Sequence, residues 1–442
     1  MPVLRYPSKI SKSYLLKLSL PIFLSNITIP FVGIVDTSLM GHLESEKYLA
    51  ATSIAATVIT LVFWSFGFLR MGTVGIVSQS LGRGDYQDIV RTVIRNILIA
   101  IFISIFIIIL KVPILFIILE YFKPSSETFE LIKAYISIRI YSSPAELSMY
   151  VIVGFYLGIQ KTNISSFTVI LFSILNIFFS IYFVKNLGLK IEGVAYGTLI
   201  SAYLTIMILI PYTYFFIKKY FKIIPRFKRI FNLNKILKLF YINFDIFIRT
   251  LLLTFAFLWL TFQSSKLGEE YLAANTILLQ FLTLAAFFLD SYAFSTEGVI
   301  GYSIGRRSEK SFFQVVKNSF ELSFITAILI SIIYVIFFKD LVGLLTDIDI
   351  VKYITFGFVF WIVFLPPIAS FCYQFDGVFI GAAQTKEMRN AMIISVATFI
   401  FISIYLQKYF GNHGLWLSMI LFMIMRSLTL MYFFKNILKK FK

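Results

Sequence analysis

The stretch LPIFLSNITIPFVGIVDTSLMGHL, residues 20–43, decides the fold expected for this chain. It is apolar over the roughly 20 residues that a helix needs to cross a bilayer. It nevertheless contains one carboxylate, Asp36, and two prolines, Pro21 and Pro30, each of which removes a backbone donor. A charged side chain in a membrane helix costs at least about 2.5–3.5 kcal/mol, so it is usually retained because it binds something. We predict a cation- or proton-binding carboxylate on a helix that can bend; the alternative is a polar residue just beyond the hydrocarbon, at the external helix end.

The composition of the whole chain extends this interpretation. Of its 442 residues 59% are hydrophobic and only 14% charged, and the mean hydropathy is +0.87, which excludes a soluble domain of this length. The apolar runs are continuous rather than alternating, so they predict helices and not a membrane barrel. The first of them is a full span rather than a cleavable signal peptide. The single cysteine, Cys372, excludes an internal disulfide, and with only two histidines a structural zinc site is not expected.

Twelve membrane spans are expected. They cover residues 13–38, 49–72, 93–118, 133–158, 163–184, 193–217, 240–264, 273–300, 317–338, 353–380, 390–407 and 414–434. With this order most Lys and Arg residues fall in the terminal segments and in the loops on their side, which places both termini in the cytoplasm. The net charge of +18 then reflects the orientation of the protein in the membrane, with the basic residues near anionic lipid headgroups. No nucleic-acid partner is expected.

The two halves of the sequence resemble each other at one constant spacing, which we call the repeat offset. It pairs residues 48–83 with residues 271–306 without a gap, and twelve of the 36 paired positions are identical. The same offset pairs Gly154 with Gly377 and Gly158 with Gly381. A register kept over so long a stretch indicates a duplication. We therefore predict an all-α polytopic membrane protein built from two six-helix repeats that are related by an axis along the membrane normal.

This duplication suggests three parts. They are an N-lobe at 1–217, a basic cytoplasmic connector at 218–239 and a C-lobe at 240–442. Two parallel repeats are typical of secondary transporters, in which two bundles rock around a central site and expose it to one side at a time.

The chain resembles the multidrug and toxic compound extrusion (MATE) family, specifically its DinF-like branch. The stretches that carry the resemblance are 20–43, 243–250, 272–275 with 289–290, 376–381 and 387–392. The resemblance implies a V-shaped, outward-open, monomeric transporter of a prokaryotic inner membrane. Such a protein extrudes amphipathic, often cationic compounds in exchange for H⁺ or Na⁺ and carries no cofactor.

The resemblance also implies a cation site in the N-lobe, made by Asp36, Asn176, Thr198 and the carbonyl of Val194. The match fails at Ser180, where relatives carry a second carboxylate. Asn176 and Ser180 are four residues apart and share a helix face. Because one carboxylate among neutral oxygens holds a hard cation weakly, we expect H⁺ coupling to be preferred to Na⁺. The alternative for Asn176 and Thr198 is ordinary hydrogen bonding between helices.

Several other charged residues fall in or near the spans. Asp245 and Arg249 are four apart, and the simplest expectation is a salt bridge between them, with a gating role as the alternative. Arg139 and Glu146, seven apart on one helix face, predict a second salt bridge.

Asp290 and Glu297 have no opposite charge beside them in the sequence. They are candidates for a C-lobe proton or substrate site, against the alternative of polar contacts near a helix end. We expect Asp376 to make a structural contact and His42 to lie exposed in a loop.

A substrate cavity is expected beside Asp36, with Phe31 and Gly33 as wall elements. The 51 phenylalanines, 25 tyrosines and 11 methionines could grip flat cations there, although most must face lipid or pack between helices.

Three other functions compete with this one. A lipid-linked precursor flippase of the same superfamily would commonly have fourteen spans and more intramembrane arginines. A membrane enzyme acting on polyprenyl substrates would need clustered acidic ligands, and Asp85-x-x-Asp88 does not resemble such a motif. A solute channel ranks third.

Overall fold

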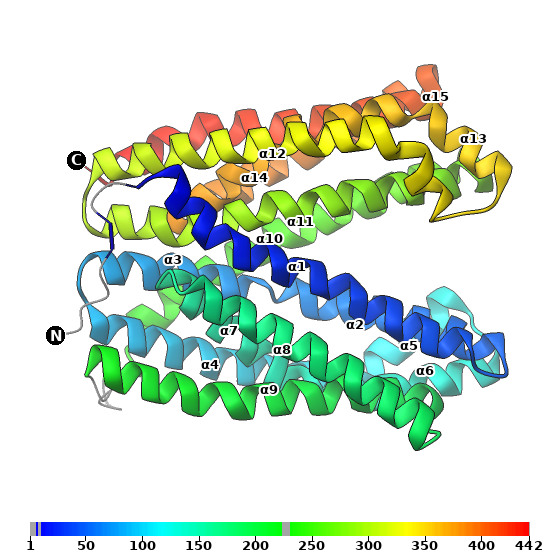
Figure 1. Ribbon diagram of the computed structural model, residues 1–442, viewed down its shortest axis with the longest axis horizontal. Coiled ribbons are helices and arrows are strands. Elements are labelled where there is room, and N and C mark those ends of the chain that lie inside the picture. Colours follow the sequence, from blue (N-terminus) through cyan, green and yellow to red (C-terminus); the bar gives the residue numbers. More distant parts are fainter. Residues whose placement is uncertain (1–5, 8–9, 223–229, 442) are drawn as a thin grey trace. The chain divides into compact units, whose positions relative to one another are not determined.

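The computed structural model describes residues 6–7, 10–222 and 230–441, and all regular structure in these residues is helical (Figure 1). The α-helices are α1 (Lys12–Gly41), α2 (Glu46–Ser65), α3 (Phe68–Gly82), α4 (Tyr86–Ile109), α5 (Lys111–Phe122), α6 (Ser126–Arg139), α7 (Ser143–Gly158), α8 (Thr162–Ile181), α9 (Lys190–Phe221), α10 (Leu233–Ser265), α11 (Glu269–Gly305), α12 (Glu309–Gly343), α13 (Asp349–Gly357), α14 (Val359–Gly381) and α15 (Thr385–Leu438). A 3-10 turn, η1 (Ile140–Ser142), and a π-helical turn, η2 (Tyr182–Asn186), complete the order. Helices satisfy their own backbone groups, which lipid cannot do. The predicted all-α class is confirmed.

Ten segments among the described residues are long and apolar enough to cross a membrane, with α2–α3 and α8–η2 each counted as one. Two further spans bring this number to the expected twelve: one comes from dividing α15, and the other from α6, η1 and α7. In α15, Gly411 has φ 55° and ψ −133°, so two helices meet there, and they correspond to the expected spans 390–407 and 414–434. The expected span 133–158 corresponds to α6, η1 and α7, where Arg139 and Glu146 lower the hydropathy.

The chain folds into two compact units. The first contains Met1–Tyr6 and Leu24–Phe240, and the second contains Pro7–Phe23 and Tyr241–Lys442. Both α1 and α10 therefore begin in one unit and continue in the other. In α1 the boundary falls two residues after Pro21, where the helix lacks a backbone donor. Residues 223–229 of the predicted basic connector lie outside the described residues.

The same helix contact recurs in both units, which supports the duplication. A Cβ added at Gly154 of α7 would lie 2.5 Å from the carbonyl oxygen of Arg70 in α3. At Gly377 of α14 it would lie 2.6 Å from the carbonyl oxygen of Ala293 in α11. The repeat offset relates each member of the first pair to its counterpart in the second. The next turn repeats the pattern with the pairs Gly158–Val77 and Gly381–Ile300.

The starts of the two repeats are also held in matching ways. The buried Arg95 of α4 donates from Nε to the carbonyl oxygen of Ile230 at 2.7 Å, just before α10. Asn318 of α12, which the repeat offset pairs with Arg95, donates to the carbonyl oxygen of Ile10 at 2.7 Å, just before α1. Each repeat therefore fixes the segment that leads into the first helix of the other repeat.

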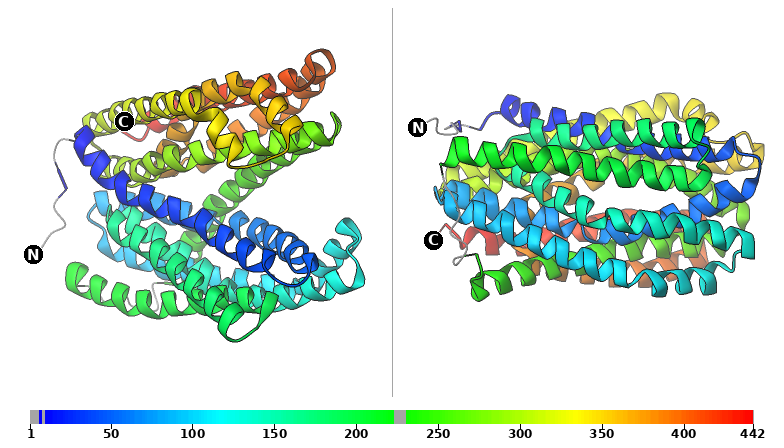
Figure 2. Two further views of the ribbon diagram at one scale, coloured as in Figure 1. Left: turned by 45° about the vertical axis from the view of Figure 1, so that its right-hand side comes forward. Right: turned by 90° about the horizontal axis from the view of Figure 1, so that it is seen from below.

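Each unit has its own packing. In the second, α11 packs against α12 and α14, and α14 against α15 (Figure 2). The core of this unit includes Phe281, Tyr334, Phe399 and Trp416. In the first, α7 packs against α3, α4 and α8, and α9 packs against α8 (Figure 1). The contact between α8 and α9 positions the candidate site.

Candidate functional site

The contact between α8 and α9 depends on two glycines of α9. A Cβ added at Gly197 would lie 2.7 Å from the Ser180 hydroxyl oxygen of α8, and one at Gly193 would lie 2.9 Å from Cγ2 of Val184 in η2, the turn that follows α8. Because neither glycine has a side chain, the two helices approach closely enough for polar side chains to bond across the contact.

A chain of hydrogen bonds runs through this contact. The Ser180 hydroxyl donates to Asn176 Oδ1 at 3.3 Å within α8, and Asn176 Nδ2 donates to Thr198 Oγ1 of α9 at 2.9 Å. Thr198 Oγ1 in turn donates to the carbonyl oxygen of Val194 at 3.2 Å. All four residues are buried. The structure thus brings together the four neutral residues of the predicted site.

Asp36 reaches this chain from the last turns of α1. Its carboxyl group faces the Ser180 hydroxyl. One carboxyl oxygen, Oδ1, is buried and has no hydrogen-bond partner among the described residues. An unsatisfied buried acceptor is costly, so the position favours a species that supplies a proton or a positive charge.

A second charged group acts on the Asp36 carboxylate. Arg139 of α6 lies close enough for its positive charge to interact with Asp36. Its guanidinium pairs with both oxygens of Glu146, at 3.2 Å for Nη2–Oε2, and lies 5.0 Å from the centroid of the Phe63 ring. The predicted salt bridge between Arg139 and Glu146 is confirmed. The buried Tyr135 lies within electrostatic range of all three charges.

Sequence reasoning missed several members of this region. Thr28 of α1 donates to Ser173 of α8 at 3.3 Å, about two helical turns from Asp36 and Ser180. Ser173, Asn176 and Ser180 are spaced three and four apart, a helix-face pattern that could have included Ser173. The proximity of Arg139 to Asp36 had no signal in the sequence, because it depends on how α6 packs in the unit.

The two residues predicted to line the cavity, Phe31 and Gly33, both lie where α1 is not covered by neighbouring residues. The Phe31 side chain is 53% exposed. No atom lies within 4 Å of the place where a Gly33 Cβ would be. His42 is exposed just after α1, as expected, and its Nδ1 lies 2.7 Å from the carbonyl oxygen of Ser38.

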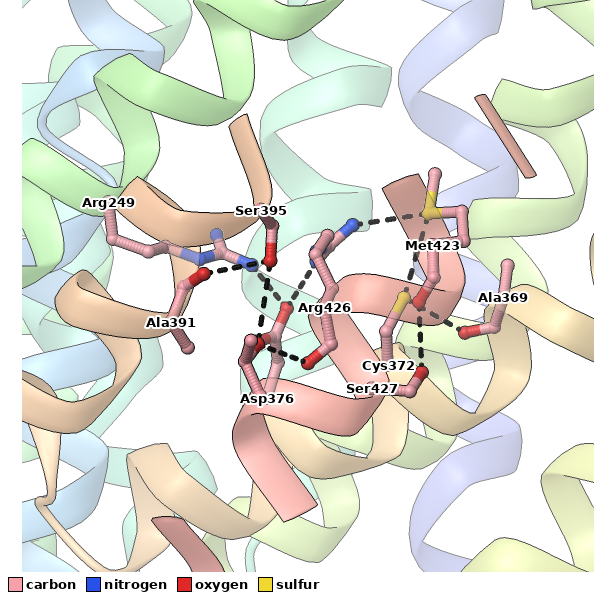
Figure 3. Close-up of polar contacts among 10 residues, drawn as sticks. Arg249, Ala369, Cys372, Asp376, Ala391, Ser395, Met423, Arg426 and Ser427 are labelled. Atoms are coloured by element: carbon pink, nitrogen blue, oxygen red, sulfur yellow. Dashed lines mark hydrogen bonds and ion pairs between the residues drawn. The ribbon is translucent and has the colours of Figure 1, made fainter. Parts of the chain in front are cut away.

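The second unit contains a buried cluster of three charges (Figure 3). Asp376 of α14 accepts a hydrogen bond from Arg426 of α15 at 2.7 Å and a second from Arg249 of α10. All three side chains are buried. The expectation that Asp376 makes a structural contact is confirmed.

The predicted salt bridge between Asp245 and Arg249 is wrong. Asp245 pairs instead with Arg389 at 2.6 Å and accepts a hydrogen bond from Thr385 at 3.2 Å. Arg249 pairs with Asp376, because partners on other helices lie closer than the residue one turn away on α10.

The other two candidates, Asp290 and Glu297, lie in α11. Glu297 is 1% exposed, and its backbone carbonyl lies against Gly381 of α14. Asp290 is half-buried within electrostatic range of Tyr373. Across the described residues, no group of three or more His, Cys, Asp or Glu side chains could hold a metal ion.

Comparison with known proteins identifies the family. The family model described as MatE matches residues 21–182 and again residues 246–407, which together are most of the chain. DNA damage-inducible protein F of Escherichia coli is 32% identical over 425 residues, which cover 93% of this chain and 90% of that protein. The chain belongs to the MatE family. The double match also supports the duplication, since each half matches the same model.

Other relatives agree with this assignment. Protein DETOXIFICATION 43 of Arabidopsis thaliana is 24% identical over 308 residues, 70% of this MatE chain and 57% of that protein. A MOP superfamily transporter from Pyrococcus furiosus has a TM-score of 0.88 at 17% identity, with 98% of this chain and 97% of that chain covered. An outward-facing multidrug resistance MATE family transporter has the same TM-score at 18% identity. The fold is that of MATE transporters.

Family membership settles one of the earlier alternatives. This chain is a multi-pass membrane protein of the MatE family, so the polyprenyl-substrate enzyme is excluded. Its similarity to DNA damage-inducible protein F over nearly the whole chain supports the DinF-like branch.

Proposed function

We propose that this transporter exports amphipathic, cationic small molecules in exchange for protons, and that Asp36 is the coupling residue. The observation that supports this most directly is the buried carboxyl oxygen of Asp36, which faces a hydrogen-bonded chain yet accepts from no described group. A proton or a cationic substrate can each satisfy that oxygen, and both cannot do so at once. Such competition is the basis of exchange.

The charges around Asp36 support protons as the coupling ion. With Asp36 ionised, the three charges of Asp36, Arg139 and Glu146 sum to −1, and with Asp36 protonated they sum to zero. Burial away from water favours the state with less net charge. Arg139 also repels a metal cation that approaches Asp36.

The neutral oxygens of the site are engaged with one another. Asn176 Oδ1 accepts from Ser180, and the Val194 carbonyl accepts from Thr198. A Na⁺ ion needs about five or six oxygens that converge on it. These oxygens would have to exchange their present bonds for the ion, whereas a proton on Asp36 needs no further ligand. Na⁺ remains the second candidate, because the same five residues contain enough oxygens to surround it.

The rest of the proposal concerns substrate and topology. The exposed ring of Phe31 and the open space at Gly33 would receive a flat cation beside Asp36. We propose that the two units are the lobes of an alternating-access cycle and that the protein works as a monomer. We place it in a prokaryotic inner membrane with both termini in the cytoplasm, from the distribution of Lys and Arg.

Transport by the purified protein in proteoliposomes, with pH and Na⁺ gradients imposed separately, tests the coupling. We expect a pH gradient alone to drive ethidium transport and a Na⁺ gradient at fixed pH to drive little. Transport that follows only the Na⁺ gradient would show that the proton assignment is wrong. Ethidium binding with no response to either gradient would contradict antiport itself.

A further inference from the structure

An apolar groove lies on the first unit, over α7 and between α4 and α9, with a volume of about 200 Å³. Ile94 and Ile97 of α4 and Ile210 of α9 form its sides, and the buried Ile152 of α7 forms its floor. Of the described residues that line it, Lys218 alone is charged. Apolar walls of this kind favour a hydrocarbon occupant.

Two stacked aromatic rings lie just beyond one end of the groove. Tyr86, at the start of α4, stacks on Phe221, at the end of α9, with ring centroids 5.2 Å apart and planes 18° apart. Each ring lies about one helical turn beyond the residues that line the groove. A chain-like ligand that lies between α4 and α9 would meet this stack at that end.

Basic side chains lie at the same end. Lys218 is exposed at the last turn of α9, and no ion pair forms between it and the described residues. Arg91 lies one turn before Ile94 on the same face of α4. Its guanidinium donates to Gln87, but its Nε is buried and has no partner among the described residues. Lys218, which lines the groove, can therefore bind an anionic oxygen at this end, and Arg91 adds a second positive charge one turn before the lining residue Ile94.

Aromatic residues take the corresponding positions in the second unit. The repeat offset pairs Ile97 and Ile152 with Phe320 and Phe375, which contact each other with ring centroids 4.9 Å apart. The Phe434 ring lies 6.2 Å from that of Phe375. Aromatic rings thus occupy in one repeat the place that smaller aliphatic side chains leave open in the other.

We propose that the groove binds one acyl chain of an anionic phospholipid, whose phosphate contacts Lys218 and Arg91. Guanidinium and ammonium groups both bind phosphate oxygens. The same two charges repel the cationic compounds proposed as substrates, so the groove is distinct from the transport site. The proposed topology places this end at the cytoplasmic leaflet, whose anionic lipids attract basic residues.

Native mass spectrometry of the delipidated full-length protein tests the site, with phosphatidylglycerol and phosphatidylcholine of identical acyl chains as probes. We expect phosphatidylglycerol to bind more tightly, and Lys218→Gln to weaken its binding roughly fivefold. Ile97→Phe, which copies the second unit, should lower the binding of both lipids. Lys439→Gln is the matched control. Gly193 and Gly414 are separated by the same number of residues as Lys218 and Lys439, so Lys439 of the second repeat corresponds to Lys218 of the first.

Several results would overturn the proposal. Equal affinity for the two lipids would show that Lys218 and Arg91 do not select an anionic headgroup. Equal losses in Lys218→Gln and Lys439→Gln would show only a general charge effect. Unchanged lipid binding by Ile97→Phe would show that the chain does not enter the groove. Lys218 is exposed, so Lys218→Gln is expected to fold even if Ile97→Phe does not. The comparison of phosphatidylglycerol with phosphatidylcholine then still tests the proposal.

Discussion

The two repeats place different side chains at one structural position. In the first, the Asp36 carboxyl group faces Ser180. In the second, the repeat offset pairs these residues with Trp259 and Ser403, and the Trp259 indole donates to the Ser403 hydroxyl at 2.9 Å. An indole has a single donor, and this one is satisfied. The carboxyl group has more acceptor capacity than its surroundings fill, so the two repeats share the contact, but only the first has an ionisable side chain at this position.

Neighbouring positions diverged in the same direction. Phe399 is the counterpart of Asn176 at the repeat offset and is buried in the apolar core of the second unit. In the second unit, two arginines neutralise the buried carboxylate of Asp376. The acid at Asp36 in the first unit is thus incompletely satisfied, whereas the acid at Asp376 in the second unit is paired.

The largest expected effect follows from this contrast. Asp36→Asn should fold and insert but lose gradient-driven ethidium transport to the level of empty liposomes, because an amide cannot exchange a proton. The measurement is transport in proteoliposomes under a pH gradient. Trp259→Phe removes the corresponding side chain of the second repeat and should retain most transport. Undiminished transport by Asp36→Asn would falsify the coupling role.

A second prediction compares the stabilities of the two acids. Asp376→Asn leaves Arg249 and Arg426 buried without a counter-charge, which should destabilise the protein by about 3–5 kcal/mol. Asp36→Asn should change stability little, since no described side chain depends on that carboxylate in the same way. Denaturation of both variants in the same detergent measures the difference. Equal stability losses would show that Asp36 is also a structural charge.

Much of the fold could be predicted from the sequence because local and repeated sequence patterns determine the helices and the duplication. Continuous apolar runs give the helices, and a constant offset gives the duplication, whose glycine pairs recur in the structure. Helix spacing also grouped Asn176 with Ser180. These inferences depend on residues close in sequence or on repeated ones.

Spacing along the sequence predicted the Arg139–Glu146 pair, but it could not predict the partners of Asp245 and Arg249. Asp245 and Arg249 are one turn apart, yet each pairs with a residue on a helix far along the chain. In a buried environment the choice of partner depends on which helices are neighbours, and sequence spacing on one helix does not contain that information. The proximity of Arg139 to Asp36 escaped prediction for the same reason.

A third prediction tests how closely the two repeats match. Gly154→Ala and Gly377→Ala each push a Cβ against a backbone carbonyl, at 2.5 and 2.6 Å, so both should destabilise by about 1–3 kcal/mol. Gly33→Ala, with open space around it, serves as the control and should cost nothing measurable. Thermal unfolding in detergent reports all three. A large difference between Gly154→Ala and Gly377→Ala would show that the shared contact has different weight in the two units.

The smallest expected effect concerns ion preference, and it depends on Ser180. Ser180→Asp adds a second carboxylate beside Asp36, so that a bound Na⁺ would meet two formal charges instead of one. Transport driven by a Na⁺ gradient at fixed pH should therefore rise severalfold over the native protein.

Ser180→Asn is the matched control for that change. It has nearly the same shape as the aspartate variant without the charge, and both must fit beside Gly197, where a Cβ would already lie 2.7 Å from the Ser180 hydroxyl. If charge sets the preference, the asparagine variant stays proton-driven while the aspartate variant gains Na⁺ response. An equal gain in both variants would mean that altered packing between α8 and α9, rather than electrostatics, controls the ion. Only a difference between them ties the ion preference of the first repeat to its number of carboxylates.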